Sequence, residues 1–201
     1  LGWLSIQLER HEDAIPLYTR ALEISELVLG PDHPDLVEPL TKLGLAYRSS
    51  NRYEDAEGVF LRVVKIVEDD RGPDHLDVAY YLEELTFLYS MQGFDINRDE
   101  KLRPLFTRVL EIKESALGPD HPDLLLPLVA QGSVFLDSGR HEEAVSLLVR
   151  AVEISDLNVS LDPSDPLKTL TSADIRSRLG DAYRALRDYG ETETLYSRAL
   201  A

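Results

Sequence analysis

Histidine and aspartate recur together at three places in the sequence, and side chains of these types could bind a metal ion or transfer protons. Residues 30–36 read Gly-Pro-Asp-His-Pro-Asp-Leu, and close copies surround His75 and His121 as the first surrounds His33. A shared metal would need all of its ligands about 2 Å from one ion. The copies begin 42 and 46 residues apart, and the packed helices of a repeat lie about 8–10 Å apart. The motif therefore predicts a repeated structural turn, not a metal or catalytic centre.

Other signatures of catalysis are missing from the sequence. His11 and His141 are each followed by glutamate, but Ile15 and Val145 stand where a zinc-binding HExxH helix needs its second histidine. There is no glycine-rich phosphate loop and no GxSxG segment. Carboxylates are plentiful, but most fall on expected exposed helix faces. We therefore predict that the chain is not an enzyme and has no catalytic residues, no metal and no cofactor.

Charge and composition restrict the possible partners. The 201 residues carry a formal net charge of −16, which disfavours nucleic acid and anionic membranes as ligands. The chain has no cysteine, which removes disulfides and thiolate sites and is compatible with a reducing compartment. No apolar run reaches the roughly 18 residues of a membrane span, and the start at Leu1 does not read as a signal peptide. These features lead us to expect a cytoplasmic protein.

Between the motifs, the apolar residues follow a helical period. Leu36, Leu40 and Leu43 recur at steps of three and four residues, as on one buried helix face. A second apolar helix follows within each period, so each repeat is predicted to be a pair of helices of roughly 16 residues, about 25 Å long. At the turn, Gly30 would end one helix and Pro34 would lie in the first turn of the next.

The predicted organisation is a single all-α array of about ten helices. Its parts are a partial repeat at 1–30, repeats at 31–72, 73–118 and 119–161, and a partial repeat at 162–201. Neither end resembles a natural cap, so we expect a fragment of a longer array. Residues 15–44 and 103–132 are identical at 19 of 30 positions, which indicates that a pair of repeats was duplicated.

The recurring positions resemble the tetratricopeptide repeat in its long 42-residue form, found in kinesin light chains and nephrocystin-3-like proteins. The residues that carry the resemblance include Leu43-Gly44, Tyr47, Ala56 and Phe60. It implies a right-handed α-solenoid in which the first helix of each pair lines a concave groove. It also implies that Gly44, together with Gly132 and Gly180 of later pairs, is small so that helices can approach closely.

The resemblance also implies which side chains of the first helices face a ligand. They form a row that is apolar near its start and becomes polar toward the C-terminus. The residues predicted to bind a peptide in the groove are Trp3, Glu38, Thr41, Leu45, Arg48, Tyr80, Glu83, Phe87, Met91, Leu126, Val129, Ser133 and Leu136. The alternative is that tight curvature or a missing neighbouring repeat buries these side chains.

The expected function is that of a protein-interaction scaffold or adaptor which binds a peptide or helix of a partner protein. Because the surrounding field is negative, we expect an apolar segment with basic flanks. Self-association through the open ends of the solenoid is a further expectation. The alternative function is a sensor or structural segment of a larger multidomain protein, for example an ATPase or a transport protein.

Overall fold

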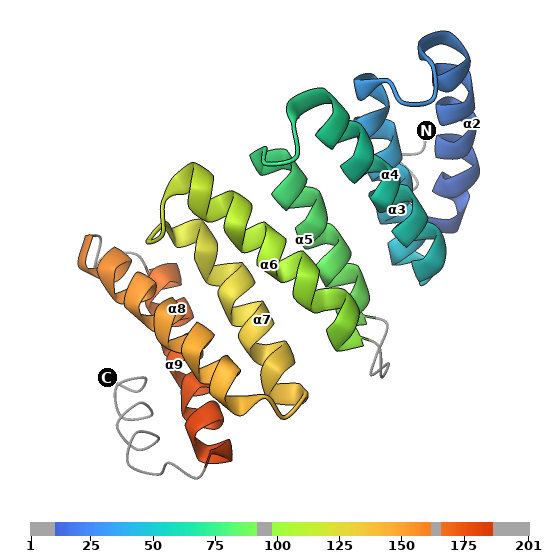
Figure 1. The fold of residues 1–201 in the computed structure, drawn as a ribbon. Helices are drawn as coiled ribbons and strands as arrows, with labels where there is room; N and C mark the ends of the chain where they lie inside the picture. The colour runs from blue at the N-terminus through green and yellow to red at the C-terminus, as the bar shows by residue number, and fades with distance from the viewer. Residues whose placement is uncertain (1–10, 92–97, 162–165, 187–201) are drawn as a thin grey trace. The chain divides into compact units, whose positions relative to one another are not determined.

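The computed structural model describes residues 11–91, 98–161 and 166–186, and all of its regular elements in these ranges are helices. The chain divides into two compact units, Leu1–Arg98 and Asp99–Ala201, and each is described by itself. In the described residues, eight α-helices and two one-turn 3-10 helices follow one another (Figure 1). The described residues thus contain eight α-helices rather than the roughly ten predicted for the whole chain. The first and last predicted helices fall on residues outside the described ranges.

The first unit is a stack of antiparallel helices. Helix α3 packs against both α2 and α4, and α4 packs against α5 (Figure 1). The 3-10 helix η1 contacts α2, α3 and α4. The elements are α2 (His11–Leu29), η1 (Pro34–Leu36), α3 (Val37–Ser49), α4 (Tyr53–Arg71) and α5 (Leu76–Met91).

The second unit repeats this arrangement about 88 residues later. Helix α8 packs against α7 and α9, and the 3-10 helix η2 lies against α7 and α8. Leu110 of α6 joins the core that η2, α7, α8 and α9 share. The elements are α6 (Arg98–Leu117), η2 (Pro122–Leu124), α7 (Leu125–Asp137), α8 (His141–Leu161) and α9 (Pro166–Ala185).

Glycine ends a helix at each of the three motifs, as predicted. Gly30, Gly72 and Gly118 have φ angles of 94°, 93° and 94°, in the left-handed region that side chains with a Cβ rarely occupy. In the first and third motifs the proline after the histidine begins the 3-10 turn, and the α-helix starts only at Val37 and Leu125. Pro34 therefore lies in a 3-10 turn that precedes the α-helix, and not in the first turn of the α-helix as predicted.

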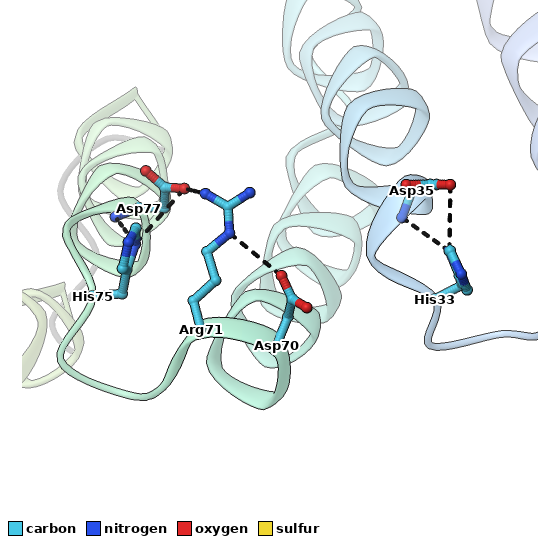
Figure 2. Close-up of polar contacts among 6 residues, drawn as sticks. All are labelled: His33, Asp35, Asp70, Arg71, His75 and Asp77. Atoms are coloured by element: carbon cyan, nitrogen blue, oxygen red, sulfur yellow. Dashed lines mark hydrogen bonds and ion pairs between the residues drawn. The ribbon is translucent and has the colours of Figure 1, made fainter.

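The motif histidines cap the following turn, a role that the sequence analysis did not assign. Nδ1 of His33 accepts a hydrogen bond from the backbone N–H of Asp35 at 3.2 Å, and Nδ1 of His75 accepts one from Asp77 at 3.2 Å (Figure 2). His121 makes the same bond to Asp123, also at 3.2 Å. Each histidine satisfies a backbone donor at a helix start, as serine or asparagine does at other N-caps.

Close approach of helices explains two of the glycines. A Cβ built at Gly44 would lie 3.0 Å from Cζ of Phe60, and one at Gly132 would lie 2.9 Å from Cγ of Leu148. Both neighbours are completely buried, so neither can swing aside into solvent. The predicted packing role is therefore confirmed at these two positions, and Gly180 is also buried, in α9.

At the first and third motifs, an arginine connects the end of one helix to the turn that follows it. Arg62 of α4 donates to Oε1 of Glu26 at 2.6 Å and also to the backbone carbonyl of Pro31. It therefore ties the end of α2 to the turn that follows. The same pair of contacts recurs in the second unit, from Arg150 to Glu114 and Pro119.

Candidate functional site

The α3 and α5 helices of the first unit share a surface held by one ion pair. Nη1 of Arg48 on α3 lies 2.5 Å from Oε2 of Glu84 on α5, and both side chains are only about one-fifth exposed. The Arg48 guanidinium also stacks over the ring of Phe87, 4.9 Å from its centroid. Such a contact is a cation–π interaction. Arg48 thus fixes the position of an apolar side chain and is itself occupied by Glu84.

An apolar stripe runs along the outward face of α5. Tyr80 and Phe87 are each 51% exposed and Met91 is 45% exposed. With Glu84 between them, these residues are spaced four, three and four positions apart, so they lie on one side of the helix. Tyr80 meets Tyr81 edge to face with ring centroids 5.0 Å apart. Partial burial, and secondarily the charge of Glu84, raise the pKa of Tyr80 above its ordinary value.

Four other residues of this unit that were predicted to bind a peptide differ in their exposure and contacts. Glu38 is exposed and accepts a hydrogen bond from Lys42 at 2.5 Å, which lowers the pKa of its carboxyl. Thr41 is half-buried and donates to the Val37 carbonyl at 2.7 Å. Leu45 and Glu83 are half-buried. Trp3, the first member of the predicted row, lies outside the described residues.

In the second unit the predicted residues divide between surface and core. Leu126 is 72% exposed, whereas Val129 and Leu136 pack against the buried clusters of the unit. Ser133 donates to the Val129 carbonyl at 2.8 Å and accepts a hydrogen bond from Nη1 of Arg178 at 2.8 Å. The side chain that ties α7 to α9 on this face is therefore Arg178, which the sequence analysis did not select.

A recurring spacing could have revealed some of these contacts. The ion pairs Glu26–Arg62, Arg48–Glu84 and Glu114–Arg150 each join residues 36 positions apart. A search for opposite charges at one fixed separation within the 42-to-46-residue period would have found all three.

Within residues 11–91, 98–161 and 166–186, no group of three or more His, Asp or Glu side chains could hold a metal ion. The three motif histidines are engaged at separate caps, two of which appear in Figure 2. Among the helices in the same ranges, none is long and apolar enough to cross a membrane.

Solved structures share this fold. A candidate kinesin light chain from Podospora anserina with nearly identical TPR-like repeats matches at 21% identity and a TM-score of 0.78, over 98% of this chain and 89% of that one. BtubC (BKLC) from P. vanneervenii matches at 20% identity and a TM-score of 0.80, over 99% and 75% of the two chains. MamA matches at 18% identity and a TM-score of 0.66, over 100% and 92%.

A search of curated proteins found no match. The family model of the tetratricopeptide repeat matches residues 4–69 and 98–156, which is more than half of the chain. The resemblance predicted from Leu43-Gly44, Tyr47, Ala56 and Phe60 is thereby confirmed, and the similar structures include kinesin light chain-like repeats. This chain is a member of the tetratricopeptide repeat family.

Proposed function

We propose that the chain is a protein-interaction scaffold that binds a segment of a partner protein along the exposed faces of α3 and α5, the first helices of its first unit. The apolar stripe of Tyr80, Phe87 and Met91 on α5 carries this proposal, because these side chains are about half exposed. Contiguous apolar surface on a protein in water marks an interaction site more often than scattered apolar residues do. Helical and extended segments are the usual occupants of such a surface.

The stripe has the features of a surface ready to bind. Arg48 holds the Phe87 ring from α3 while paired with Glu84, so the aromatic side chain is partly ordered before a partner arrives. Preordered aromatic anchors lose little conformational entropy on binding, and they dominate many interfaces.

The charge of the chain favours a partner segment with basic flanks. With a net charge of −16, approach of a cationic segment is accelerated and approach of an acidic one is opposed. The proposal includes no catalytic step and assumes the cytoplasm as the compartment. The right-handed superhelix and the single array of repeats at 1–30, 31–72, 73–118, 119–161 and 162–201 are parts of the same proposal.

Affinity capture with matched surface variants tests this function. Phe87→Glu places a charge in the stripe, whereas Leu61→Glu places one on α4, where Leu61 is 48% exposed and lies outside the stripe. We expect the wild-type chain and the Leu61→Glu variant to retain the same partner proteins from a lysate, and Phe87→Glu to lose them. Far-ultraviolet circular dichroism verifies that both variants keep their helix content.

Retention of the same proteins by all three forms would contradict binding at the α5 stripe. Capture of no protein whose retention depends on Phe87 would favour the alternative, a sensor or structural segment of a larger protein.

A further inference from the structure

Helices α2 and α8 carry the same residues along one face. Four positions of that face, 130 residues apart in the chain, hold identical residue types: Leu17 and Leu147, Arg20 and Arg150, Ala21 and Ala151, and Ile24 and Ile154. Steps of three and four positions place the four residues on one side of each helix. The two faces have the same chemistry, so their surroundings can be compared position by position.

In α8 the apolar part of this face is packed. Ala151 is fully buried and Ile154 is 1% exposed, and Leu147 is partly buried beside them. The cluster that they share includes Ile175 of the following helix α9. Its other buried members come from the elements before α8 and are Leu110 of α6, Leu124 of η2 and Leu128 of α7. This face of α8 is therefore a contact surface for the helix, turn and helix that precede it.

In α2 the same face is open to solvent. Leu17 is 39% exposed and Ile24 is 51% exposed, and Ala21 is exposed between them. Helix α3 packs against α2 as α9 packs against α8, so the following helix is in place in both units. Within the described residues, α2 has no counterpart of α6, η2 and α7. A contiguous exposed apolar face of this kind marks an interaction site.

The arginine on this face differs in the same way between the helices. Arg150 donates to Glu114 at the end of α6 and to the carbonyl of Pro119 in the turn, and its side chain is 34% exposed. Arg62, at the equivalent position of α4, makes the same two kinds of contact to the end of α2 and its turn. Arg20 pairs instead with Glu23 of its own helix, and its side chain is 72% exposed.

The acceptors of these two arginines share a short sequence. Glu26 and Pro31 are the first and last residues of Glu-x3-Gly-Pro, and so are Glu114 and Pro119. The glycine ends the helix, which places the proline carbonyl of the turn within reach of the same side chain as the glutamate. One guanidinium has five N–H donors in a fixed planar arrangement and can bind both acceptors at once.

We propose that the face of α2 formed by Leu17, Arg20, Ala21 and Ile24 docks a further helical hairpin of this repeat type, whose first helix ends in Glu-x3-Gly-Pro. Leucines of that hairpin pack on Ala21 and Ile24. Arg20 exchanges Glu23 for the glutamate and the proline carbonyl of the hairpin. The face lies on a different helix from the α5 stripe, so this inference does not rest on the proposed function.

A chain extended by one hairpin tests the docking face. Residues 98–130 comprise α6, η2 and the first turns of α7, and residues 1–10 correspond in the repeat to residues 131–140. A second copy of residues 98–130 joined ahead of Leu1 therefore places its leucines and its glutamate in register with α2. Hydrogen exchange measured by mass spectrometry should show the α2 amides slowed by about tenfold or more relative to the unextended chain.

Two variants control this measurement. Ile24→Glu should abolish the slowing in the extended chain and leave the exchange of α2 unchanged in the unextended one, because Ile24 is half exposed there. Phe87→Glu should leave the slowing intact, because it alters only the α5 stripe. Equal exchange of α2 in the extended and unextended chains would overturn the docking face.

Urea unfolding tests the role of Arg20. In the extended chain, Arg20→Met should lower the urea midpoint about as much as Arg62→Met does, whereas in the unextended chain it should have little effect. Glu114→Gln in the added copy should lower the midpoint similarly, and the two changes together should lower it little further, as expected for residues that bind each other. An equally small effect of Arg20→Met in both chains would overturn the assignment of the Glu-x3-Gly-Pro helix.

Sedimentation velocity of the unextended chain tests the alternative occupant, a second copy of the chain. A monomer at every concentration tested supports the hairpin as the occupant. A dimer that Ile24→Glu dissociates and Leu61→Glu does not would overturn it, because two copies would then cover the α2 faces.

Discussion

The fit between Gly44 and Phe60 gives a sharp test of how the helices of each pair approach one another. In Gly44→Ala the new Cβ would lie 3.0, 3.1 and 3.3 Å from three carbon atoms of the Phe60 ring. Ordinary contacts between carbon atoms are about 3.5–4.0 Å, so the helices or the ring must shift by about half an ångström. Because Phe60 is completely buried in α4, its ring cannot swing out into solvent.

Two opposing free energies decide the size of the effect. Overpacking a closed core costs about 1–3 kcal/mol, whereas replacing glycine by alanine inside a helix stabilises it by about 1 kcal/mol. Gly44→Ala should therefore lower the free energy of unfolding by about 0–2 kcal/mol. Gly58→Ala is the matched control, because Gly58 lies exposed within α4 and a Cβ there meets nothing within 4 Å. That variant should be stabilised by about 1 kcal/mol.

Urea unfolding followed by circular dichroism at 222 nm measures both variants. We expect the midpoint of Gly44→Ala to fall below that of Gly58→Ala by an amount equivalent to about 1–3 kcal/mol. Gly132→Ala should behave as Gly44→Ala does, since its Cβ would lie 2.9 Å from Cγ of the buried Leu148. If Gly44→Ala stabilised the chain as much as Gly58→Ala, the close approach of α3 and α4 would be refuted.

Three further predictions concern polar contacts. Arg62→Met removes the contacts that join the end of α2 to the following turn, and it should lower the free energy of unfolding by about 1 kcal/mol. Arg20→Met breaks a pair whose arginine is 72% exposed and should change the free energy of unfolding by less than about 0.5 kcal/mol. Equal effects of the two variants in urea unfolding would contradict the stabilising role of Arg62. His33→Ala should cost about 1 kcal/mol and His33→Asn much less, because asparagine also caps helices; equal thermal midpoints for the two variants would argue against the cap. The hydrogen bond from Arg140 lowers the pKa of the Glu143 carboxyl in the folded chain. The stability that this bond contributes is therefore present above the unfolded pKa of Glu143 and is lost as pH falls through the folded pKa. Glu143→Gln should therefore lose less stability than the wild type in urea titrations between about pH 5 and pH 3, and an unchanged acid slope would count against this pair.

The turns could be read from the sequence because their causes are local. Glycine followed by proline at three nearly constant intervals predicted helix ends, and Gly30, Gly72 and Gly118 have the positive φ angles that such ends require. The small residue at Gly44 was likewise assigned to packing, and its distance to Phe60 confirms this role. In each case the residue type limits the backbone or the available space at its own position.

The exposure of the predicted binding residues could not be read in the same way. Leu45 and Phe87 hold equivalent positions in the repeat, yet Leu45 is half-buried and Phe87 is 51% exposed. Arg48 was predicted as a ligand contact, but Glu84 and the Phe87 ring already engage it. Helical periodicity indicates the side of a helix on which a residue lies, but not how far the neighbouring helix covers it.

By itself, the sequence determined the helical repeat, the positions of its turns and the glycines at which helices meet, because backbone conformation and side-chain size act over a few residues. Only the tertiary structure decided that the motif histidines are caps, that Arg178 joins α9 to Ser133, and that the face which α2 and α8 share is exposed in α2 and packed in α8. These features depend on distances between helices that are more than 30 residues apart in the chain or on the orientation of a single ring. Periodicity along one helix carries no information about either.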